Sequence, residues 1–338
     1  MRRKKPISIT DVAKRSGVSI ATVSRVLNNF GNVSDTTRQR VMDAIEQTGY
    51  EPCHKTAPTH SQSDVVLVML PDPTNDSYKP FLEGLHKAAE ALGVRPMFAY
   101  TYKNAETECR WHKFALSQKF LGVIAVSPKC DAAEMRRLAR QLPVVQCYDY
   151  VADTGVAVVC VDDESAGYEA TKYLINHGHR RIALLTANEK GTTCTINREK
   201  GYVRALKEAG IPYDSSMTFN ASFVAEEQIA PVEEALKHAD RFDAIFCVGD
   251  MLAARVESIA REKGIRVPED LSVIGFDDNL ICTLVTPKIT TVSQNHYKIG
   301  YYALKTIVDQ IQLGESFWGG VTASIDHFIV ERDSVCEK

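Results

Sequence analysis

Residues 7–50 read ISITDVAKRSGVSIATVSRVLNNFGNVSDTTRQRVMDAIEQTGY, and this stretch predicts two short helices joined by a tight turn and followed by a third helix. Ser8 opens a motif that resembles a capping box, and we expect the helix that follows it to end at Gly17. Ser19 is the predicted cap of the second helix and Ser34 that of the third. Two helices joined in this way form a helix-turn-helix, whose second helix enters the major groove of DNA.

The apolar residues of the second helix fall on one face. Val23, Val26 and Leu27 are predicted to pack against Val12 and Ala13 of the first helix. The residues expected to point outward are Ile20, Ala21, Thr22 and Arg25, and those expected to close the core from the third helix are Val41, Met42 and Ile45. Any small three-helix domain shows a pattern of this kind, so the pattern alone does not decide for DNA.

Positive charge is concentrated in the same part of the chain. Residues 1–60 contain ten Lys and Arg against five acidic residues, a net charge of +5, whereas the remainder has 30 basic and 38 acidic residues, a net charge of −8. A basic end favours a polyanionic partner, and DNA phosphates are such a partner.

The second predicted helix also offers side chains suited to reading DNA. Arg25 is the candidate for a bidentate hydrogen bond to guanine, with a phosphate contact as the alternative. Ile20 and Ala21 can make only apolar contacts, for instance with thymine methyl groups. The polar side chains better suited to phosphates are Ser19, Thr22, Ser24, Asn28 and Asn29.

From Asp64 onward the sequence alternates short apolar strands with amphipathic helices. Runs such as VVLVMLP (65–71) and VAVVCVD (156–162) are rich in Val, and a second set of such runs extends from RRIALLT (180–186) to LSVIGFDD (271–278). This order predicts an α/β core of two doubly wound parallel-sheet lobes, the arrangement of periplasmic binding proteins. In that arrangement a small ligand binds between the lobes, at the carboxyl ends of the strands.

Composition and motifs exclude several classes. The 338 residues are 44% hydrophobic and 25% charged, and no apolar run approaches the length of a membrane span, so we expect a cytoplasmic protein with no membrane partner. The nine cysteines form no CxxC pair and are interpreted as reduced and structural. There is no P-loop, GxSxG or HExxH motif, so we expect neither an enzyme nor a cofactor. His177 and His179 are interpreted as shaping a turn rather than binding metal.

The amino-acid sequence of the basic N-terminal segment resembles that of a known family. DVAKRSGVS-ATVSRVLN-----VS--TR-RV--AI---GY-P is similar to the DNA-binding headpiece of the lactose/galactose repressor (LacI/GalR) family of bacterial transcription regulators, and the later block VPEDLSVIGFDDN (267–279) resembles the core of that family. The resemblance covers nearly the whole chain and implies a homodimer. It also implies a headpiece at 1–50, a linker at 51–64, a first lobe at 65–162 and 293–322, and a second lobe at 163–292 and 323–338.

The linker departs from the family pattern. In the family this segment carries a hinge helix that places a Leu in the minor groove, whereas here Thr59 occupies the position of that Leu, directly after Pro58. Because a proline breaks the middle of a helix, we expect this linker to lack a hinge helix of that kind.

Strand ends, together with the resemblance, supply candidate effector-binding residues. Asp277, at the end of an apolar strand, can accept paired hydrogen bonds from sugar hydroxyls, and Arg198 offers a guanidinium with five donors. Tyr78 and Phe223 can stack on a sugar or a base, and Gln294 can reach the ligand through water.

Together these features predict a homodimeric transcription regulator, most simply a repressor, that binds a pseudopalindromic operator and responds to a small effector between the lobes. A sugar is the expected effector because sugars are the most common effectors of the family. A nucleoside or purine effector, the absence of any small effector, and a sugar-binding protein with no DNA role are the alternatives. Gly249 stands where some sugar-binding members have Asn, which argues against a galactoside-like pose.

Overall fold

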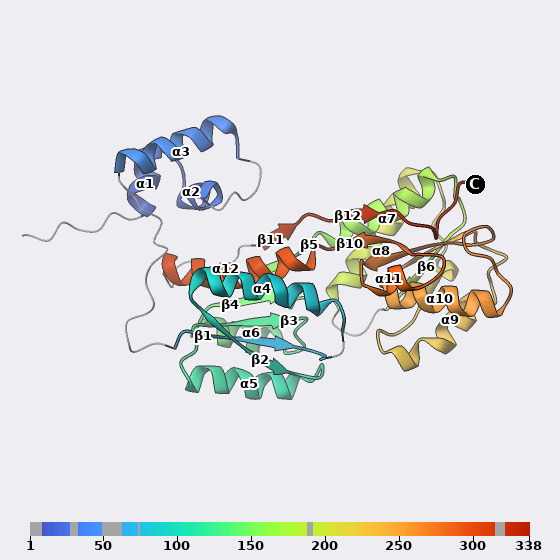
Figure 1. The fold of residues 1–338 in the computed structure, drawn as a ribbon, viewed down its shortest axis with the longest axis horizontal. Coiled ribbons are helices and arrows are strands. Elements are labelled where there is room, and N and C mark those ends of the chain that lie inside the picture. The colour runs from blue at the N-terminus through green and yellow to red at the C-terminus, as the bar shows by residue number, and fades with distance from the viewer. Residues whose placement is uncertain (1–8, 28–32, 49–62, 74, 188–191, 315–321) are drawn as a thin grey trace, which may run out of the picture. The chain divides into compact units, whose positions relative to one another are not determined.

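A computed structural model describes residues 9–27, 33–48, 63–73, 75–187, 192–314 and 322–338, and the chain divides into one unit over Met1–Ala57 and a second over Pro58–Lys338 (Figure 1). The predictions for Ser8, Asn28, Asn29 and the hinge of the linker lie outside the described residues.

The described part of the first unit contains the three predicted helices. Gly17 ends the first helix with a left-handed φ of 66°, a conformation that favours glycine. Ser19 caps the second helix, since its Oγ accepts a hydrogen bond from the N–H of Thr22 at 3.1 Å. Ser34 caps the third in the same way through the N–H of Thr37, at 3.4 Å. The helices are α1 (Ile9–Ser16), α2 (Ile20–Leu27) and α3 (Asp35–Thr48).

A small apolar core holds these helices together, with two differences from the prediction. Its fully buried members are Val12, Val23 and Val41, one from each helix. Met42 is 50% exposed, and Ala44 faces the core instead, because residues three apart share one face of a helix while adjacent residues do not. Ile20 packs partly against the core rather than pointing outward.

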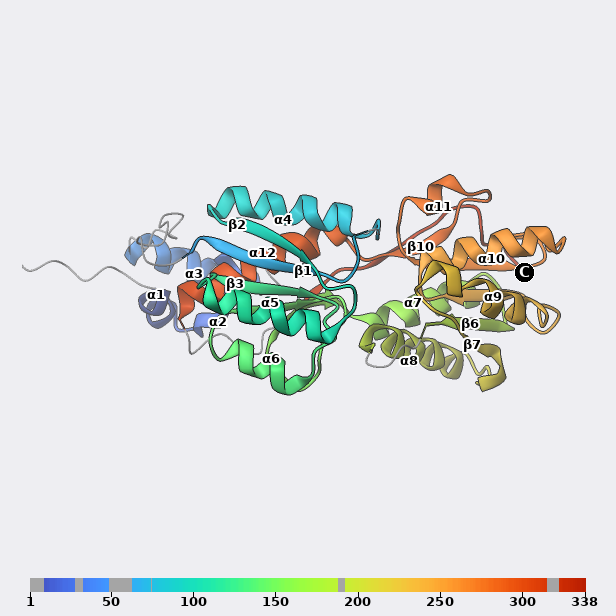
Figure 2. The same ribbon diagram turned by 90° about the horizontal axis from the view of Figure 1, so that it is seen from below.

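Among the described residues, the second unit forms two six-stranded sheets, each within its own lobe (Figures 1 and 2). The first sheet is parallel throughout, with α4 and α12 on one face and α5 and α6 on the other. Its strands, in spatial order, are β11 (Thr322–Ile325), β5 (Ala157–Val161), β4 (Val144–Cys147), β3 (Gly122–Val126), β1 (Val65–Leu70) and β2 (Arg95–Tyr100). Its helices are α4 (Tyr78–Leu92), α5 (Ala105–Ser117), α6 (Ala132–Ala139) and α12 (His296–Leu313).

The second lobe repeats this plan with one antiparallel edge strand, β12, which pairs with β10. Its strands, in spatial order, are β12 (Phe328–Val330), β10 (Thr290–Ser293), β9 (Ser272–Asp277), β8 (Ala244–Cys247), β6 (Ile182–Thr186) and β7 (Thr218–Asn220). Its helices are α7 (Asp163–Asn176), α8 (Thr193–Glu208), α9 (Ile229–Leu236), α10 (Asp250–Glu262) and the short α11 (Ile281–Leu284), with 3-10 turns η1 (Ser215–Met217) and η2 (Ala225–Glu227). No helix in the described ranges is long and apolar enough to cross a membrane.

The described chain passes between the lobes three times: from β5 to α7, from β10 to α12, and from β11 to β12. The last passage comes later than the predicted boundary after residue 322. Ile325 pairs with Val161 of β5, so β11 belongs to the first sheet and the chain crosses at Asp326 and His327. Ser293 pairs with Asp277 and so belongs to the second sheet.

Glycines allow α4 and α12 to approach each other almost backbone to backbone. A Cβ atom on Gly84 of α4 would lie 1.9 Å from the carbonyl oxygen of Tyr297, and one on Gly300 of α12 would lie 1.9 Å from that of Phe81. No side chain fits at either position, so the two glycines set the spacing of this helix pair.

We therefore expect Gly300→Ala to destabilise the protein by about 1–3 kcal/mol, the usual cost of overpacking, although alanine alone favours a helix. Urea unfolding of the variant and of the parent measures the difference. The control is Glu83→Ala on the exposed face of α4, which should change stability by no more than about 0.5 kcal/mol. A Gly300→Ala protein as stable as the parent would contradict this role of glycine.

Candidate functional site

The second helix of the headpiece exposes part of the predicted DNA-reading set. Ala21 and Arg25 are exposed, while Thr22 and Ser24 are partly buried. The hydroxyl groups of Ser19 and Thr22 lie 2.9 Å apart, so both are oriented at the start of α2. Arg25, in the last turn of this helix, is the one described member of the set with a positive charge.

The carboxyl ends of the strands of the two sheets meet where the lobes join. Ser77, which follows β1, donates through its hydroxyl to Oδ1 of Asn279, which follows β9, at 2.8 Å. Asp149, which follows β4, accepts the backbone N–H groups of Thr193 at 2.6 Å and Cys194 at 3.2 Å. Since both of these donors lie in the first turn of α8, a carboxylate of the first lobe caps a helix of the second lobe.

Asp277, the last residue of β9, is held by residues of the passage from β10 to α12. One of its carboxylate oxygens accepts a hydrogen bond from Gln294, and its carbonyl oxygen accepts one from Nε2 of His296 at 2.7 Å. Burial lowers the pKa of His296, so the ring is neutral and its Nδ1 accepts the hydroxyl of Tyr148 at 2.9 Å. A φ of 116° places the Asp277 backbone in the left-handed region.

Arg198 of α8 is buried and fixed by three contacts within the second lobe. Its Nε donates to Oδ1 of Asp163 at 2.8 Å, and its Nη1 donates to the carbonyl oxygen of Val248 at 2.7 Å. The guanidinium carbon lies 3.5 Å from the centroid of the Phe276 ring. Although burial alone lowers the pKa of Arg198, the carboxylate of Asp163 keeps that pKa above its ordinary value.

The two predicted stacking residues lie in opposite lobes. Tyr78, the first residue of α4, is buried, and burial together with nearby carboxylates that include Asp277 raises its pKa. Phe223 follows β7 and is 36% exposed. A Cβ atom on Gly249 would lie 3.3 Å from Cε1 of Phe223 and 3.9 Å from Oδ2 of Asp277, so these three residues come together. The five predicted effector residues are thus near the join of the lobes, and their binding role stays a prediction.

Three further acids occupy the same region, and the sequence reasoning missed them. Each comes within three residues of the end of a buried strand, in the runs CYD, VDD and VGD, and this signal could have identified Asp149, Asp163 and Asp250. Asp250 has no exposed surface; its Oδ2 accepts the N–H of Asn279 at 2.7 Å and its Oδ1 accepts the hydroxyl of Thr291 at 2.6 Å.

Acidic groups therefore dominate the join of the lobes. Burial and, after it, the charge of Asp277 raise the pKa of Asp250 to about 8. Burial also raises the pKa of Asp277, against the opposing effects of Arg198 and His296. Asp149 and Asp163 are also buried here, and Asp163 and Asp277 are the carboxyl groups that act on the buried guanidinium of Arg198. Such a site can accept hydrogen bonds from hydroxyl groups and disfavours anions.

Comparisons with known proteins agree with this architecture. Residues 8–53 match the family of bacterial regulatory proteins of the lacI type, and residues 171–335 match the periplasmic binding protein-like domain. The chain is 34% identical to the HTH-type transcriptional regulator DegA of Bacillus subtilis, over 87% of this chain and 88% of that protein. It is 30% identical to the HTH-type transcriptional repressor CytR of Escherichia coli, over 90% of each.

A solved structure is similar over nearly the whole chain. The complex of the transcriptional regulator CelR with cellobiose has a TM-score of 0.72 and 26% identity, and the match covers 97% of this chain and 99% of that one. A helix-turn-helix joined to a two-lobed binding core defines a class of regulators that couple DNA binding to a second site. The protein belongs to the LacI family of bacterial transcription regulators, so the predicted family and fold are confirmed, and it is a DNA-binding regulator rather than an enzyme.

The raised pKa of Asp250 predicts that stability falls as pH rises. The folded protein keeps this proton up to about pH 8, whereas the unfolded chain releases it near its ordinary pKa of about 3.9. Between about pH 5 and pH 8, unfolding therefore releases a proton, and a higher pH favours the unfolded chain. We expect the urea midpoint to fall across this range, by the equivalent of a few kcal/mol at most.

Asp250→Asn has no proton to release, and it should flatten part of this slope. The remaining slope is expected because burial also raises the pKa of Glu257 to about 8. Asp326→Asn is the matched control, since that side chain is 93% exposed. If Asp250→Asn and the parent show parallel pH profiles, the assignment to Asp250 is wrong.

Proposed function

We propose that the protein is a homodimeric repressor that binds a pseudopalindromic operator and is controlled by a neutral sugar bound between the lobes. The observation that carries the proposal is the set of fixed polar groups at the strand ends, above all Asp277 and Arg198, in a chain that also has an exposed DNA-reading helix. The chain is 30% identical to a repressor, CytR, and this similarity supports repression of transcription rather than activation. An operator-binding protein of this kind acts in the cytoplasm.

The charge of the site favours a neutral effector with many hydroxyl groups. A phosphate would meet the carboxylates of Asp149, Asp163 and Asp277, while the buried guanidinium of Arg198 already pairs with Asp163. Sugar hydroxyls can donate to carboxylates and accept from remaining donors, so they suit both kinds of group. The partly exposed ring of Phe223 offers an apolar surface for a sugar ring. CelR, a structural relative, forms a complex with cellobiose.

Contacts between the lobes provide a route for control. Asp149 of the first lobe caps α8, and α8 also carries Arg198. An effector that contacts Arg198 and Asp277 would therefore favour one lobe arrangement over another. Coupling between two such sites is typically about 1–3 kcal/mol, which is enough to change operator affinity by about 5- to 150-fold.

A dimer matches the symmetry of a pseudopalindromic operator. Helices α10 and α11 pack against each other, and apolar side chains are exposed on both. Met251 is 44% exposed, Leu280 62% and Leu284 68%. We place the dimer contact on this apolar surface. Sedimentation that shows a monomer at micromolar concentration would contradict the dimer.

Replacing Arg25 tests the reading of DNA. On a pseudopalindrome obtained by selection from random DNA, Arg25→Ala should lose about 1–3 kcal/mol of affinity per half-site and relax the preference at one base pair. Gel-shift titration on single-base variants of the site measures both effects. Arg110→Ala, which removes an exposed arginine of the first lobe, should leave affinity unchanged. An equal loss on every sequence would mean that Arg25 contacts phosphate.

A thermal-shift screen tests the effector class, with neutral mono- and disaccharides, sugar phosphates, nucleosides and purines as ligands. A neutral sugar at 100 times its Kd should stabilise the protein by about 2.7 kcal/mol. Asp277→Asn should weaken the binding of that sugar by about 1–3 kcal/mol, because a charged acceptor is lost. Asp326→Asn should leave the binding free energy unchanged. A hit confined to nucleosides, purines or sugar phosphates would reject the neutral sugar. If no ligand raises the Tm while the protein still binds its operator, control by an effector of these classes is rejected.

A further inference from the structure

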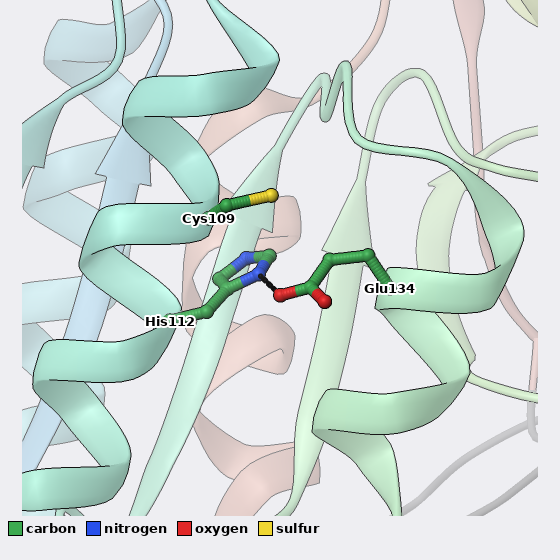
Figure 3. Close-up of side chains that lie close together, drawn as sticks. All are labelled: Cys109, His112 and Glu134. Atoms are coloured by element: carbon green, nitrogen blue, oxygen red, sulfur yellow. Dashed lines mark hydrogen bonds and ion pairs between the residues drawn. The ribbon is translucent and has the colours of Figure 1, made fainter.

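A cluster of three potential metal ligands lies in the first lobe, where α5 and α6 cover one face of the sheet (Figure 3). Cys109 and His112 are three residues apart on α5, and Glu134 projects toward them from α6. One ligand atom from each residue lies within 4.8 Å of the other two, and this is the one such group of three among the described residues. None of the three belongs to the DNA-reading helix or to the site between the lobes.

The imidazole of His112 is incompletely satisfied in this cluster. Its side chain has no exposed surface, and its Nδ1 lies 3.0 Å from Oε1 of Glu134. The other ring nitrogen, Nε2, is buried with no hydrogen-bond partner. A hydrogen bond from Nδ1 to the carboxylate accounts for the contact with Glu134 but leaves Nε2 unexplained, since buried polar atoms nearly always have partners. Burial also lowers the pKa of His112, so the ring is neutral and retains a lone pair.

Glu134 has a second partner that a metal would have to share. Arg137 donates to Oε2 through Nε at 2.6 Å and to Oε1 through Nη2 at 2.7 Å. The Arg137 side chain is 44% exposed, so one of its hydrogen bonds can be replaced by water at little cost. Glu134 can then turn one oxygen to a metal while the other stays with Arg137.

We propose that Cys109, His112 and Glu134 form a binding site for Zn²⁺, with the thiolate, a ring nitrogen and a carboxylate oxygen as protein ligands and water as the fourth. Bonds of about 2.0–2.3 Å at tetrahedral angles place ligand atoms about 3.3–3.6 Å apart. One ligand atom from each of the three residues lies within 4.8 Å of the other two, so the side chains must draw closer to reach this spacing. Cys109 is partly exposed, which gives the ion a path from solvent and room for the water ligand.

The donor set selects the kind of ion. Thiolate and imidazole are soft or intermediate donors that favour Zn²⁺, whereas Mg²⁺ and Ca²⁺ require sites made almost wholly of oxygen. In the metal-free protein, burial followed by the charges of Glu134 and Glu108 raises the pKa of Cys109, so binding displaces the thiol proton to solvent. The bound ion would join α5 to α6 and so stabilise the first lobe.

The experiment uses the full-length protein, stripped with a chelator, dialysed and titrated with Zn²⁺ alone and with Co²⁺ alone. We expect one ion per chain at saturation, a rise in Tm with Zn²⁺, and a thiolate-to-cobalt charge-transfer band with Co²⁺. Cys109→Ser should abolish the band and weaken Zn²⁺ binding by more than about tenfold. The matched control is Cys336→Ser, which removes a partly exposed thiol from the second lobe and should retain both the band and the affinity.

A parent protein that binds no Zn²⁺, or a Cys109→Ser protein that keeps the cobalt band, would overturn the proposal. Loss of the band in Cys336→Ser instead would assign the metal to another thiol and would overturn it too. Glu134→Gln gives a second measurement if Cys109→Ser does not fold, since it keeps a hydrogen-bonding side chain for Arg137 and should also weaken Zn²⁺ binding. Operator binding is measured on the same samples and should persist, so failure of the metal site is distinct from failure of the regulator.

Discussion

The site between the lobes depends on one buried ion pair, between Arg198 of α8 and Asp163 of α7. Burying two charges is costly, and the pair is tolerable because the guanidinium is also satisfied by a carbonyl oxygen and lies over an aromatic ring. Glycine makes the geometry possible. A Cβ atom on Gly167 would lie 2.3 Å from the carbonyl oxygen of Arg198, so only a residue without a side chain lets α7 and α8 come this close.

The same helix links the ion pair to the other lobe. The first turn of α8 donates to Asp149 from the first lobe, and Arg198 lies only a few residues further along. A carboxylate at a helix N-terminus is stabilised by the exposed N–H groups and by the helix dipole. A shift of α8 would therefore change the contact between the lobes and the position of Arg198 together. This arrangement gives the proposed ligand at the strand ends a way to act on the relative position of the lobes.

Local patterns in the sequence were enough to predict much of the fold. Helix caps and a glycine stop involve residues a few positions apart, so Gly17, Ser19 and Ser34 identified the headpiece helices correctly. The alternation of strands and helices likewise predicted two parallel-sheet lobes. The exchange of Met42 for Ala44 in the headpiece core was missed, because helical periodicity leaves the orientation of a face uncertain by about one position.

The candidate sites were harder to predict, since they depend on contacts between distant segments. The cap that Asp149 provides to α8 joins residues 44 positions apart, and the approach of His112 to Glu134 joins residues 22 positions apart. No spacing rule connects either pair, because their proximity follows from how two helices or two lobes pack. Family resemblance supplied Asp277 and Arg198, but it carried no information about the acids around them.

Left-handed backbones and buried charge occur together at the join of the lobes. Tyr148, Asp277 and Asn295 are non-glycine residues with left-handed backbones, and each lies at or just after the end of a strand. Such conformations cost about 1–3 kcal/mol each and persist only where the surroundings enforce them. The sheets behind them are filled with ordinary apolar residues that carry no such cost. These unfavourable conformations lie where the two lobes join, so the proposed binding of a ligand there would shift the balance between lobe arrangements without unfolding either lobe.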